Sequence, residues 1–286
     1  MVKANYYKID SFPDGTPLIK KYRAINYLNV ISIVWTFESM AELPTVVMIA
    51  KDAKDNGGEV ELFMPYIPNA RMDRVHSDED VFTLKWFAEE INRCEFNCVT
   101  VFDPHSDVAP ALIDRCEVHT PIREICQVIE ESKPDVIYFP DAGAMKRYEE
   151  TVHWALDRAK CSAYIIHGDK KRDWATGKIL GLDVVGEVKP GEKILMIDDI
   201  CSYGGTMFYS AKKLKELGAG DIDMYVSHCE NSILDSERGH LFDDPELIHM
   251  VYTTDSIFTG HHDKITVLEH RWDAVSYTHL TLPTIR

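Results

Sequence analysis

Two adjacent acids followed by a glycine-rich loop are the residues of this sequence best suited to chemistry. Asp198 and Asp199 follow the apolar run Ile194–Ile197, and a Gly-Gly-Thr sequence stands at 204–206. The apolar run predicts a strand buried on both faces of an α/β sheet, and ligands bind at the carboxyl ends of such strands. Glycines let a backbone approach closely, and free N–H groups at a helix start attract an anion such as phosphate. Phosphate, sugar and metal could therefore meet within one turn of chain.

A helix is predicted directly after this loop. Thr206 is expected to cap it and Gly218 to end it. Its apolar face would carry Met207, Phe208, Ala211, Leu214 and Leu217. Because carboxylates repel phosphate, the two acids are assigned to a metal ion or to sugar hydroxyls. The alternative is an acidic pair in an ordinary solvated loop.

The segment 193–206 resembles the phosphoribosyl-diphosphate motif of type I phosphoribosyltransferases and ribose-phosphate pyrophosphokinases. Further segments resemble pyrophosphokinase motifs in that family's order: FPDGTP at 12–17, MPYIPNARMDR at 64–74, VFDPHSD at 101–107 and FPDAGAMKR at 139–147. The segment at 64–74 resembles an ATP site that the transferases lack. The chain is therefore identified as a divergent member of the pyrophosphokinase family.

The resemblance implies an α/β fold of two type I phosphoribosyltransferase-like domains, each with a largely parallel sheet flanked by helices. We expect domains at 1–120 and 121–274, with 275–286 a non-native tail, because that stretch shows no helical or strand periodicity. Alternating patterns agree with βαβ units. Strands are predicted at 29–35, 60–65, 98–103, 135–139, 163–167, 193–198, 222–227, 249–253 and 264–268.

Two helix starts are predicted from local signals. Ser77 with Asp80 is typical of a capping arrangement, and Thr120 followed by Pro121 marks the second start. The apolar faces would carry Val81, Leu84, Ala88 and Ile91 in the first helix, and Ile122, Ile125, Cys126 and Ile129 in the second.

The resemblance also assigns ATP and magnesium to particular residues. ATP would be bound by Phe12, Asp14, Arg71, Asp73, Arg74 and His105. The metal ligands would be Asp141, Asp198, Asp199 and His105, although magnesium prefers oxygen, so that His105 could equally contact ATP phosphate. Without the resemblance, Phe12 is a candidate for core packing, His105 for a polar loop, and the arginines for a surface salt-bridge cluster.

A charged segment, HGDKKRD, supplies the candidate catalytic residues. Lys170 and Arg172 match the Lys-x-Arg at the root of the family's mobile catalytic loop. Cations that arrive on a loop stabilise transition-state charge while excluding water. The alternative is a solvated charged turn.

The sequence departs from the family pattern inside the glycine loop. Ser202 and Tyr203 stand where the family typically has Asp and Thr, at the place that grips ribose 5-phosphate. Tyr203 could donate its hydroxyl to that phosphate, or stack on a base attached through it, as in ADP-ribose. The residues assigned to ribose and phosphate are Asp198, Asp199, Ser202, Tyr203, Gly204, Gly205 and Thr206.

The implied reaction is ATP-dependent transfer of pyrophosphate to a ribose 1-hydroxyl with release of AMP. Ribose 5-phosphate is the first candidate acceptor and ADP-ribose the alternative. Two other classes remain open: a phosphoribosyltransferase, and a non-catalytic regulatory subunit of a synthetase complex.

Composition limits the partners. A net charge of −16 argues against a broad nucleic-acid surface, and no apolar run is long enough to span a membrane. Seven cysteines without a paired framework indicate reduced thiols, and Cys201 in the loop is expected to pack. With no signal-peptide pattern at the N-terminus, we expect a cytoplasmic enzyme of small molecules. The resemblance implies a homo-oligomer, a dimer or a hexamer, because the family shares ATP sites between subunits.

Overall fold

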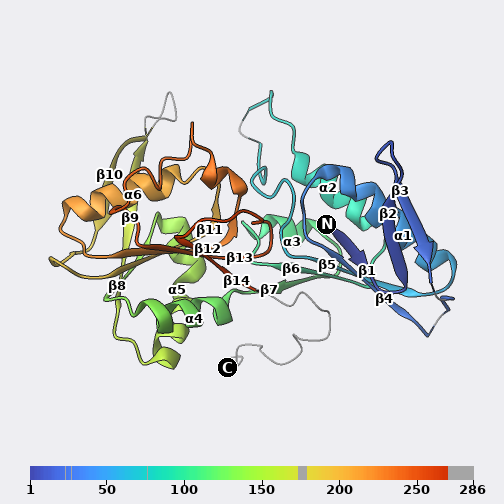
Figure 1. Cartoon of the computed structure of the whole chain (residues 1–286), viewed down its shortest axis with the longest axis horizontal. Helices are drawn as coiled ribbons and strands as arrows, with labels where there is room; N and C mark the ends of the chain where they lie inside the picture. Colours follow the sequence, from blue (N-terminus) through green and yellow to red (C-terminus); the bar gives the residue numbers. More distant parts are fainter. Residues whose placement is uncertain (23, 27, 76, 173–178, 270–286) are drawn as a thin grey trace. The chain divides into compact units, whose positions relative to one another are not determined.

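The chain forms two compact units, Met1–Thr120 and Pro121–Glu269, each described here by itself (Figure 1). The computed structural model describes all residues except 23, 27, 76, 173–178 and 270–286, and the side chains at 170–172 and 179–181 are also outside it. The expected tail at 275–286 therefore lies outside the described residues.

The first unit is built on a five-stranded sheet in the order β1-β4-β5-β6-β7, in which β4 to β7 are parallel and β1 is antiparallel to β4. Its strands are β1 (Val2–Ala4), β4 (Val30–Trp35), β5 (Glu59–Met64), β6 (Cys98–Phe102) and β7 (Cys116–His119), beside the separate hairpin of β2 (Tyr7–Ser11) and β3 (Pro17–Lys21). Its helices are η1 (Met40–Glu42), α1 (Leu43–Asp55), α2 (Thr83–Asn92) and α3 (Val108–Leu112).

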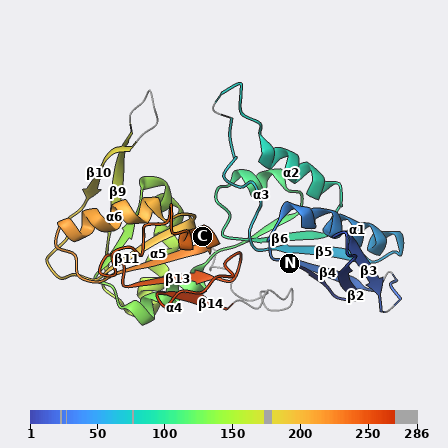
Figure 2. The same cartoon turned by 45° about the horizontal axis from the view of Figure 1, so that its top comes forward.

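Helices α1 and α2 cover one face of this sheet, as both views show (Figures 1 and 2). In β4, Ile31, Ile33 and Trp35 are buried at every second position, and in α2 Leu84 and Phe87 are buried at helical spacing. These two periods place the apolar side chains of strand and helix in one core.

The second unit is built on a seven-stranded sheet in the order β10-β9-β8-β11-β12-β13-β14, parallel except for the β9–β10 pair. Its strands are β8 (Val136–Phe139), β9 (Tyr164–Arg172), β10 (Ile179–Val185), β11 (Ile194–Cys201), β12 (Ile222–Cys229), β13 (Met250–Thr254) and β14 (Ile265–Leu268). Its helices are α4 (Ile122–Ser132), α5 (Ala142–Ala159), α6 (Gly205–Glu216) and η2 (Asn231–Leu234).

Helix α6 lies on one face of this sheet and α4 and α5 on the other (Figure 1). Met196 of β11 packs in the same core as Met207 and Leu214 of α6, whereas Leu195 and Ile197 pack with α4 and α5. A strand covered on both faces must be apolar on both, which explains the unbroken run before the two acids.

The predicted α/β class is confirmed, and so are all nine predicted strands, as β4, β5, β6, β8, β9, β11, β12, β13 and β14. The second predicted helix is confirmed as α4, with its four predicted face residues buried. Among the described residues, we find no helix that combines the length and the hydropathy of a membrane span.

The predicted start of the helix after Ser77 was wrong. The Asp80 carboxylate accepts from the backbone N–H of Ser77 at 3.0 Å, so this pair closes a turn of its own. Helix α2 begins at Thr83, with no side-chain cap, and Val81 is left outside it at 69% exposed.

Candidate active site

The two acids lie in the second half of β11, a central strand flanked by β8 and β12, which continues to Cys201, three residues beyond the predicted strand end. Asp198 is half-buried and Asp199 is only 4% exposed. The Asp199 Oδ2 lies 2.9 Å from Nη1 of Arg147 on α5, so its charge is paired. Sequence reasoning missed Arg147, although it closes the segment at 139–147 that drew attention to Asp141.

Asp198 has a different environment. Burial raises the pKa of its carboxyl well above the ordinary value, and the nearby charges of Asp199 and Asp141 raise it further. The Asp199 backbone N–H donates to Asp198 Oδ1 at 3.0 Å, which opposes that shift. Burial and the neighbouring acids disfavour the ionised form of Asp198. A bound cation would offset this effect, and the carboxyl could also form hydrogen bonds with sugar hydroxyls.

Asp141 follows β8, the strand that pairs with β11, so both acidic segments lie at the same edge of the sheet. Its Oδ1 caps α5 by accepting from the N–H groups of Gly143 and Ala144, at 3.0 Å each. The predicted metal residue therefore has a structural role as a helix cap, worth about 1 kcal/mol.

The glycine loop begins α6 as expected, but its cap differs from the prediction. Gly204 is the N-cap, with φ 79°, and no side chain caps the helix. Thr206 lies inside the first turn, so the prediction that it caps was wrong. Gly204 adopts the left-handed conformation that glycine favours, and the helix starts two residues earlier than a Thr206 cap required.

This helix start leaves backbone donors for an anion. The Phe208 N–H bonds back to the Gly204 carbonyl at 2.8 Å, and the N–H groups before it have no partner inside the helix. A Cβ at Gly205 would meet no heavy atom within 4 Å, so the space in front of these donors is open on the Gly205 side. The arrangement can bind a phosphate.

Ser202 brings in an acid from elsewhere in the chain. Its Oγ donates to Oε2 of Glu230, which follows β12, at 2.8 Å, and Ser232 Oγ donates to the same oxygen at 3.2 Å. Ser202 stands where the family typically has an aspartate. Its hydrogen bond to Glu230 brings another carboxylate next to this position. The only feature of the sequence that could have indicated Glu230 is its position three residues after the predicted strand 222–227.

Tyr203 contacts a second residue that sequence reasoning missed. The Arg238 Nη1 donates to the Tyr203 hydroxyl at 2.9 Å, and the guanidinium carbon lies 5.3 Å from the centre of the ring. The phenol and the cation therefore form a pair beside the glycine loop.

Cys201 is packed rather than reactive, as expected. It is 3% exposed, and hydrogen bonding to Cys229 on the adjacent strand together with burial raises the pKa of its thiol. A thiol held protonated in this way is a poor nucleophile.

The predicted ATP residues of the first unit follow two adjacent parallel strands. Arg71, Asp73 and Arg74 come after β5 and His105 after β6, so their segments leave the sheet at the same edge. Arg74 Nε lies 3.6 Å from Asp73 Oδ1, with the Arg74 side chain 74% exposed. This contact agrees with the salt-bridge alternative for that pair, and such exposed pairs contribute little stability.

Phe12 and Asp14 occupy the turn of the β2–β3 hairpin. Phe12 is 49% exposed, which rules out the core-packing alternative. The Asp14 Oδ1 accepts from the Thr16 hydroxyl at 2.7 Å and from its N–H at 3.0 Å, and these bonds lower the pKa of Asp14. Asp14 therefore shapes the turn that presents Phe12.

The backbone of Lys170 and Arg172 forms the last part of β9, paired antiparallel with β10. Their side chains lie outside the described part of the structure, and residues 173–178 follow them. Their predicted catalytic role stays a prediction.

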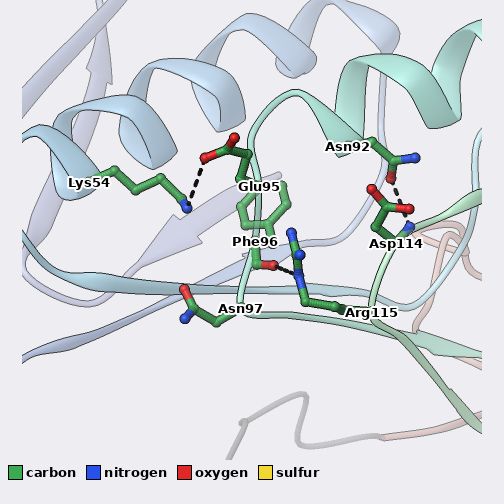
Figure 3. A pocket seen from close by; sticks show the side chains of 7 residues that line it. All are labelled: Lys54, Asn92, Glu95, Phe96, Asn97, Asp114 and Arg115. Atoms are coloured by element: carbon green, nitrogen blue, oxygen red, sulfur yellow. Dashed lines mark hydrogen bonds and ion pairs between the residues drawn. The ribbon is translucent and has the colours of Figure 1, made fainter.

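The first unit contains a cavity of about 460 Å³ (Figure 3). It is lined by Lys54, Asn92, Glu95, Phe96, Asn97, Asp114 and Arg115. Asn97 and Arg115 directly precede β6 and β7, so the cavity lies at the amino ends of these strands. Ligands of open α/β sheets bind at the opposite edge, and the lining carries two cations and two acids without a surplus of either sign. We do not assign it to the reaction.

Comparison with known proteins finds relatives of this chain. No protein-family model matches the chain. The ribose-phosphate pyrophosphokinase of Saccharolobus solfataricus is 24% identical over 221 residues, which cover 76% of this chain and 74% of that protein. The enzyme of the same name from Thermococcus kodakarensis is 28% identical over 231 residues, covering 77% and 76%. The chain is a divergent relative of the ribose-phosphate pyrophosphokinases.

The resemblance stated for the sequence motifs is thereby confirmed, and the similarity supports an enzyme of this class. The ribose-phosphate pyrophosphokinase of Prochlorococcus marinus extends the match to 86% of the chain, at 28% identity over 251 residues. The fold is similar to the crystal structure of phosphoribosylpyrophosphate synthetase from Mycobacterium smegmatis, with a TM-score of 0.71 over 92% of this chain and 85% of that one, at 18% identity. The predicted fold class is confirmed.

Proposed function

We propose that this protein transfers pyrophosphate from ATP to the 1-hydroxyl of a ribose phosphorylated on C5, with ribose 5-phosphate as the acceptor. The products are phosphoribosyl pyrophosphate and AMP. The observation that carries the proposal is the edge formed by Asp198, Asp199 and the start of α6, in a chain related to the ribose-phosphate pyrophosphokinases.

In this proposal the second unit holds the acceptor. Asp198 and Asp199 accept hydrogen bonds from the ribose hydroxyls, and the N–H groups that follow Gly204 bind the 5-phosphate. The ribose O1 forms a bond to the β-phosphorus of ATP, the bond from that phosphorus to the α–β bridging oxygen breaks, and the hydroxyl loses its proton. Such a step depends on positioning and on neutralising charge.

The residues proposed to bind ATP belong to the first unit, and the proposed catalytic cations belong to β9 of the second unit. Arg71 and Arg74 would bind triphosphate oxygens, His105 a phosphate or a metal-bound water, and the exposed ring of Phe12 would stack on adenine. Lys170 and Arg172 would neutralise charge in the transition state.

The acids of the second unit fit a magnesium ion that arrives bound to the phosphates of the substrate. Within the described residues, no group of three or more acid, histidine or cysteine side chains converges as a metal cage. Magnesium usually takes one or two carboxylates and completes its shell with phosphates and water. Asp198, whose ionised form is disfavoured among neighbouring acids, fits that partial donor set, with Asp141 and Asp199 beside it. The ion would neutralise phosphate charge.

ADP-ribose is the second candidate acceptor, favoured by one observation. The Tyr203–Arg238 pair places an aromatic ring and a cation beside the phosphate loop. An adenosine 5-diphosphate attached to ribose offers both a ring to stack and phosphate charge to pair. The terminal ribose of ADP-ribose retains a free 1-hydroxyl for the same reaction.

We further propose that the enzyme is a cytoplasmic homo-oligomer. Support comes from Phe12, because an exposed aromatic side chain at a hairpin turn suits contact with a second copy. A transferase or an inactive regulatory subunit is less well supported, because the relatives reported above are named as pyrophosphokinases.

The test is an assay of AMP release. The protein is incubated with ATP, magnesium and either ribose 5-phosphate or ADP-ribose, AMP is quantified by chromatography, and the acceptor product is identified by mass. We expect AMP and a pyrophosphorylated sugar with ribose 5-phosphate. Product from ADP-ribose alone would replace the first acceptor by the second, and no AMP with either acceptor would refute the kinase assignment. Reactions without acceptor measure background ATP hydrolysis.

A further inference from the structure

The segment 235–242 contains a turn at one end and contacts the glycine loop at the other. The Asp235 Oδ1 accepts from the N–H groups of Glu237 and Arg238, at 2.9 and 3.1 Å, and so closes a turn. At the other end Leu241 packs on Gly204, where an added Cβ would lie 3.2 Å from the Leu241 Cβ. This anchoring fixes the place of Arg238 beside the start of α6.

Arg238 is an exposed cation whose side chain contacts an aromatic residue instead of an acid. One N–H bonds to the Tyr203 hydroxyl, and the guanidinium lies near the ring. Within the described part of the chain, no carboxylate lies within ion-pair distance of its guanidinium. The protein contains 47 acids against 31 lysines and arginines, so an arginine without an acidic partner is notable here.

The guanidinium retains donors for a ligand. It carries five N–H groups, and the contact with Tyr203 uses one. Its planar fork matches the oxygens of a phosphoryl group better than any other cationic side chain. Tyr203 immediately precedes Gly204, so the cation lies next to the backbone donors proposed for phosphate.

We infer that Arg238 is a specificity-determining residue of the acceptor site, which donates hydrogen bonds to phosphoryl oxygens carried on C5 of the ribose. This inference rests on the proposed function, since it assumes that the acceptor binds at the glycine loop. Tyr203 positions the guanidinium, and the departure from the family pattern at 203 thereby supplies a cation in place of a threonine hydroxyl.

The experiment measures binding separately from turnover. Dissociation constants for ribose 5-phosphate, ADP-ribose and ATP are determined by calorimetry for the wild type, Arg238→Gln and Arg238→Lys. The control is Arg158→Gln, because Arg158 on α5 also lies over an aromatic ring, 5.5 Å from the centre of Trp154. Thermal melts establish that each variant is folded.

We expect Arg238→Gln to raise the dissociation constant of a phosphorylated acceptor about tenfold, since a charge-assisted bond is lost. Arg238→Lys should raise it about threefold, because it keeps the charge and loses the fork. The ATP constant and the Arg158→Gln control should stay within about twofold of the wild type. Weakening of both acceptors would assign Arg238 to the phosphate on C5, and weakening of ADP-ribose alone would assign it to the outer phosphate.

Unchanged acceptor binding in Arg238→Gln would overturn the inference. If the wild type binds an acceptor through Arg238 but releases no AMP, the kinase proposal fails and the role of Arg238 stands. If AMP is released and the variant binds the acceptor normally, the inference alone fails. A wild type that binds neither acceptor overturns both.

Discussion

Two carboxyl groups with raised pKa values lie toward opposite ends of the strands in the second unit. Asp223 lies near the amino end of β12 and Asp198 near the carboxyl end of β11. Burial raises the pKa of both. Asp223 is compensated by His249, whose Nδ1 lies 2.8 Å from its Oδ1, whereas Asp198 has Asp199 and Asp141 as charged neighbours.

The difference separates a structural acid, Asp223, from Asp198, the acid proposed to bind the substrate. An acid with a raised folded-state pKa binds its proton more tightly in the folded than in the unfolded state. Its ionisation therefore costs stability increasingly as the pH rises above the unfolded pKa, and the cost is complete above the folded pKa. A histidine reduces this cost at Asp223. At Asp198 the neighbouring acids increase the stability cost of ionisation. The metal ion of a bound substrate would supply the positive charge that offsets this cost.

The largest predicted effect is at Asp198. Asp198→Asn should lower turnover by about 100-fold or more, because the carboxylate proposed to bind the ribose hydroxyls or the metal ion is lost. The same change should raise the melting temperature by about 2–4 °C at pH 8, a gain that disappears toward pH 4, where the wild-type acid is protonated. AMP release and thermal melts between pH 4 and 8 measure the two effects.

Asp223→Asn is the matched control for this prediction, since it neutralises a buried acid at the other end of the sheet. It should leave turnover unchanged. A loss of turnover as large as that of Asp198→Asn would remove the distinction between the two acids.

Arg147→Gln should have the next largest effect, on stability. It removes the cation 2.9 Å from Asp199, a side chain only 6% exposed, and should lower the free energy of unfolding by about 2–3 kcal/mol. Urea unfolding measures the change. Lys146 is an exposed neighbour on α5, and Lys146→Gln should have almost no effect on the free energy of unfolding. Equal losses in the two variants would mean that the Arg147–Asp199 ion pair does not stabilise the fold.

The two glycines of the loop should behave differently. Gly204→Ala places a Cβ at positive φ and against Leu241, and should cost about 1–2 kcal/mol of stability. Gly205→Ala enters open space, so stability should be kept while the methyl group weakens acceptor phosphate binding severalfold. Urea unfolding and calorimetry together test this pair, and unchanged acceptor affinity in Gly205→Ala would place the phosphate elsewhere.

His249→Ala should have the smallest effect. It removes the partner of Asp223 and should lower stability by about 1 kcal/mol at neutral pH, since the His249 side chain is 58% exposed and solvent weakens the pair. Turnover should be unchanged. A drop in turnover without a change in melting temperature would show that this end of the sheet also serves the reaction.

Local patterns were sufficient for much of the fold and part of the site. The apolar runs predicted nine strands because each is short, apolar and bounded by polar residues, and the acids after Ile197 needed only their position on a strand. The short edge strands β1 and β7 escaped prediction because exposed polar residues such as Lys3 and Glu117 leave no apolar run. The cap prediction at Thr206 failed because a left-handed glycine starts the helix without a side chain.

The sequence by itself determined the elements, the acid pair and the glycine loop, since these depend on residues adjacent along the chain. Only the tertiary structure decided which charges meet there. Arg147 pairs with Asp199, Glu230 accepts from Ser202, and Arg238 contacts Tyr203, across separations of 52, 28 and 35 residues. Electrostatic contacts act over a few ångströms, whatever the distance along the chain, so the pairing of charges depends on how strands and loops come together at one edge of the sheet.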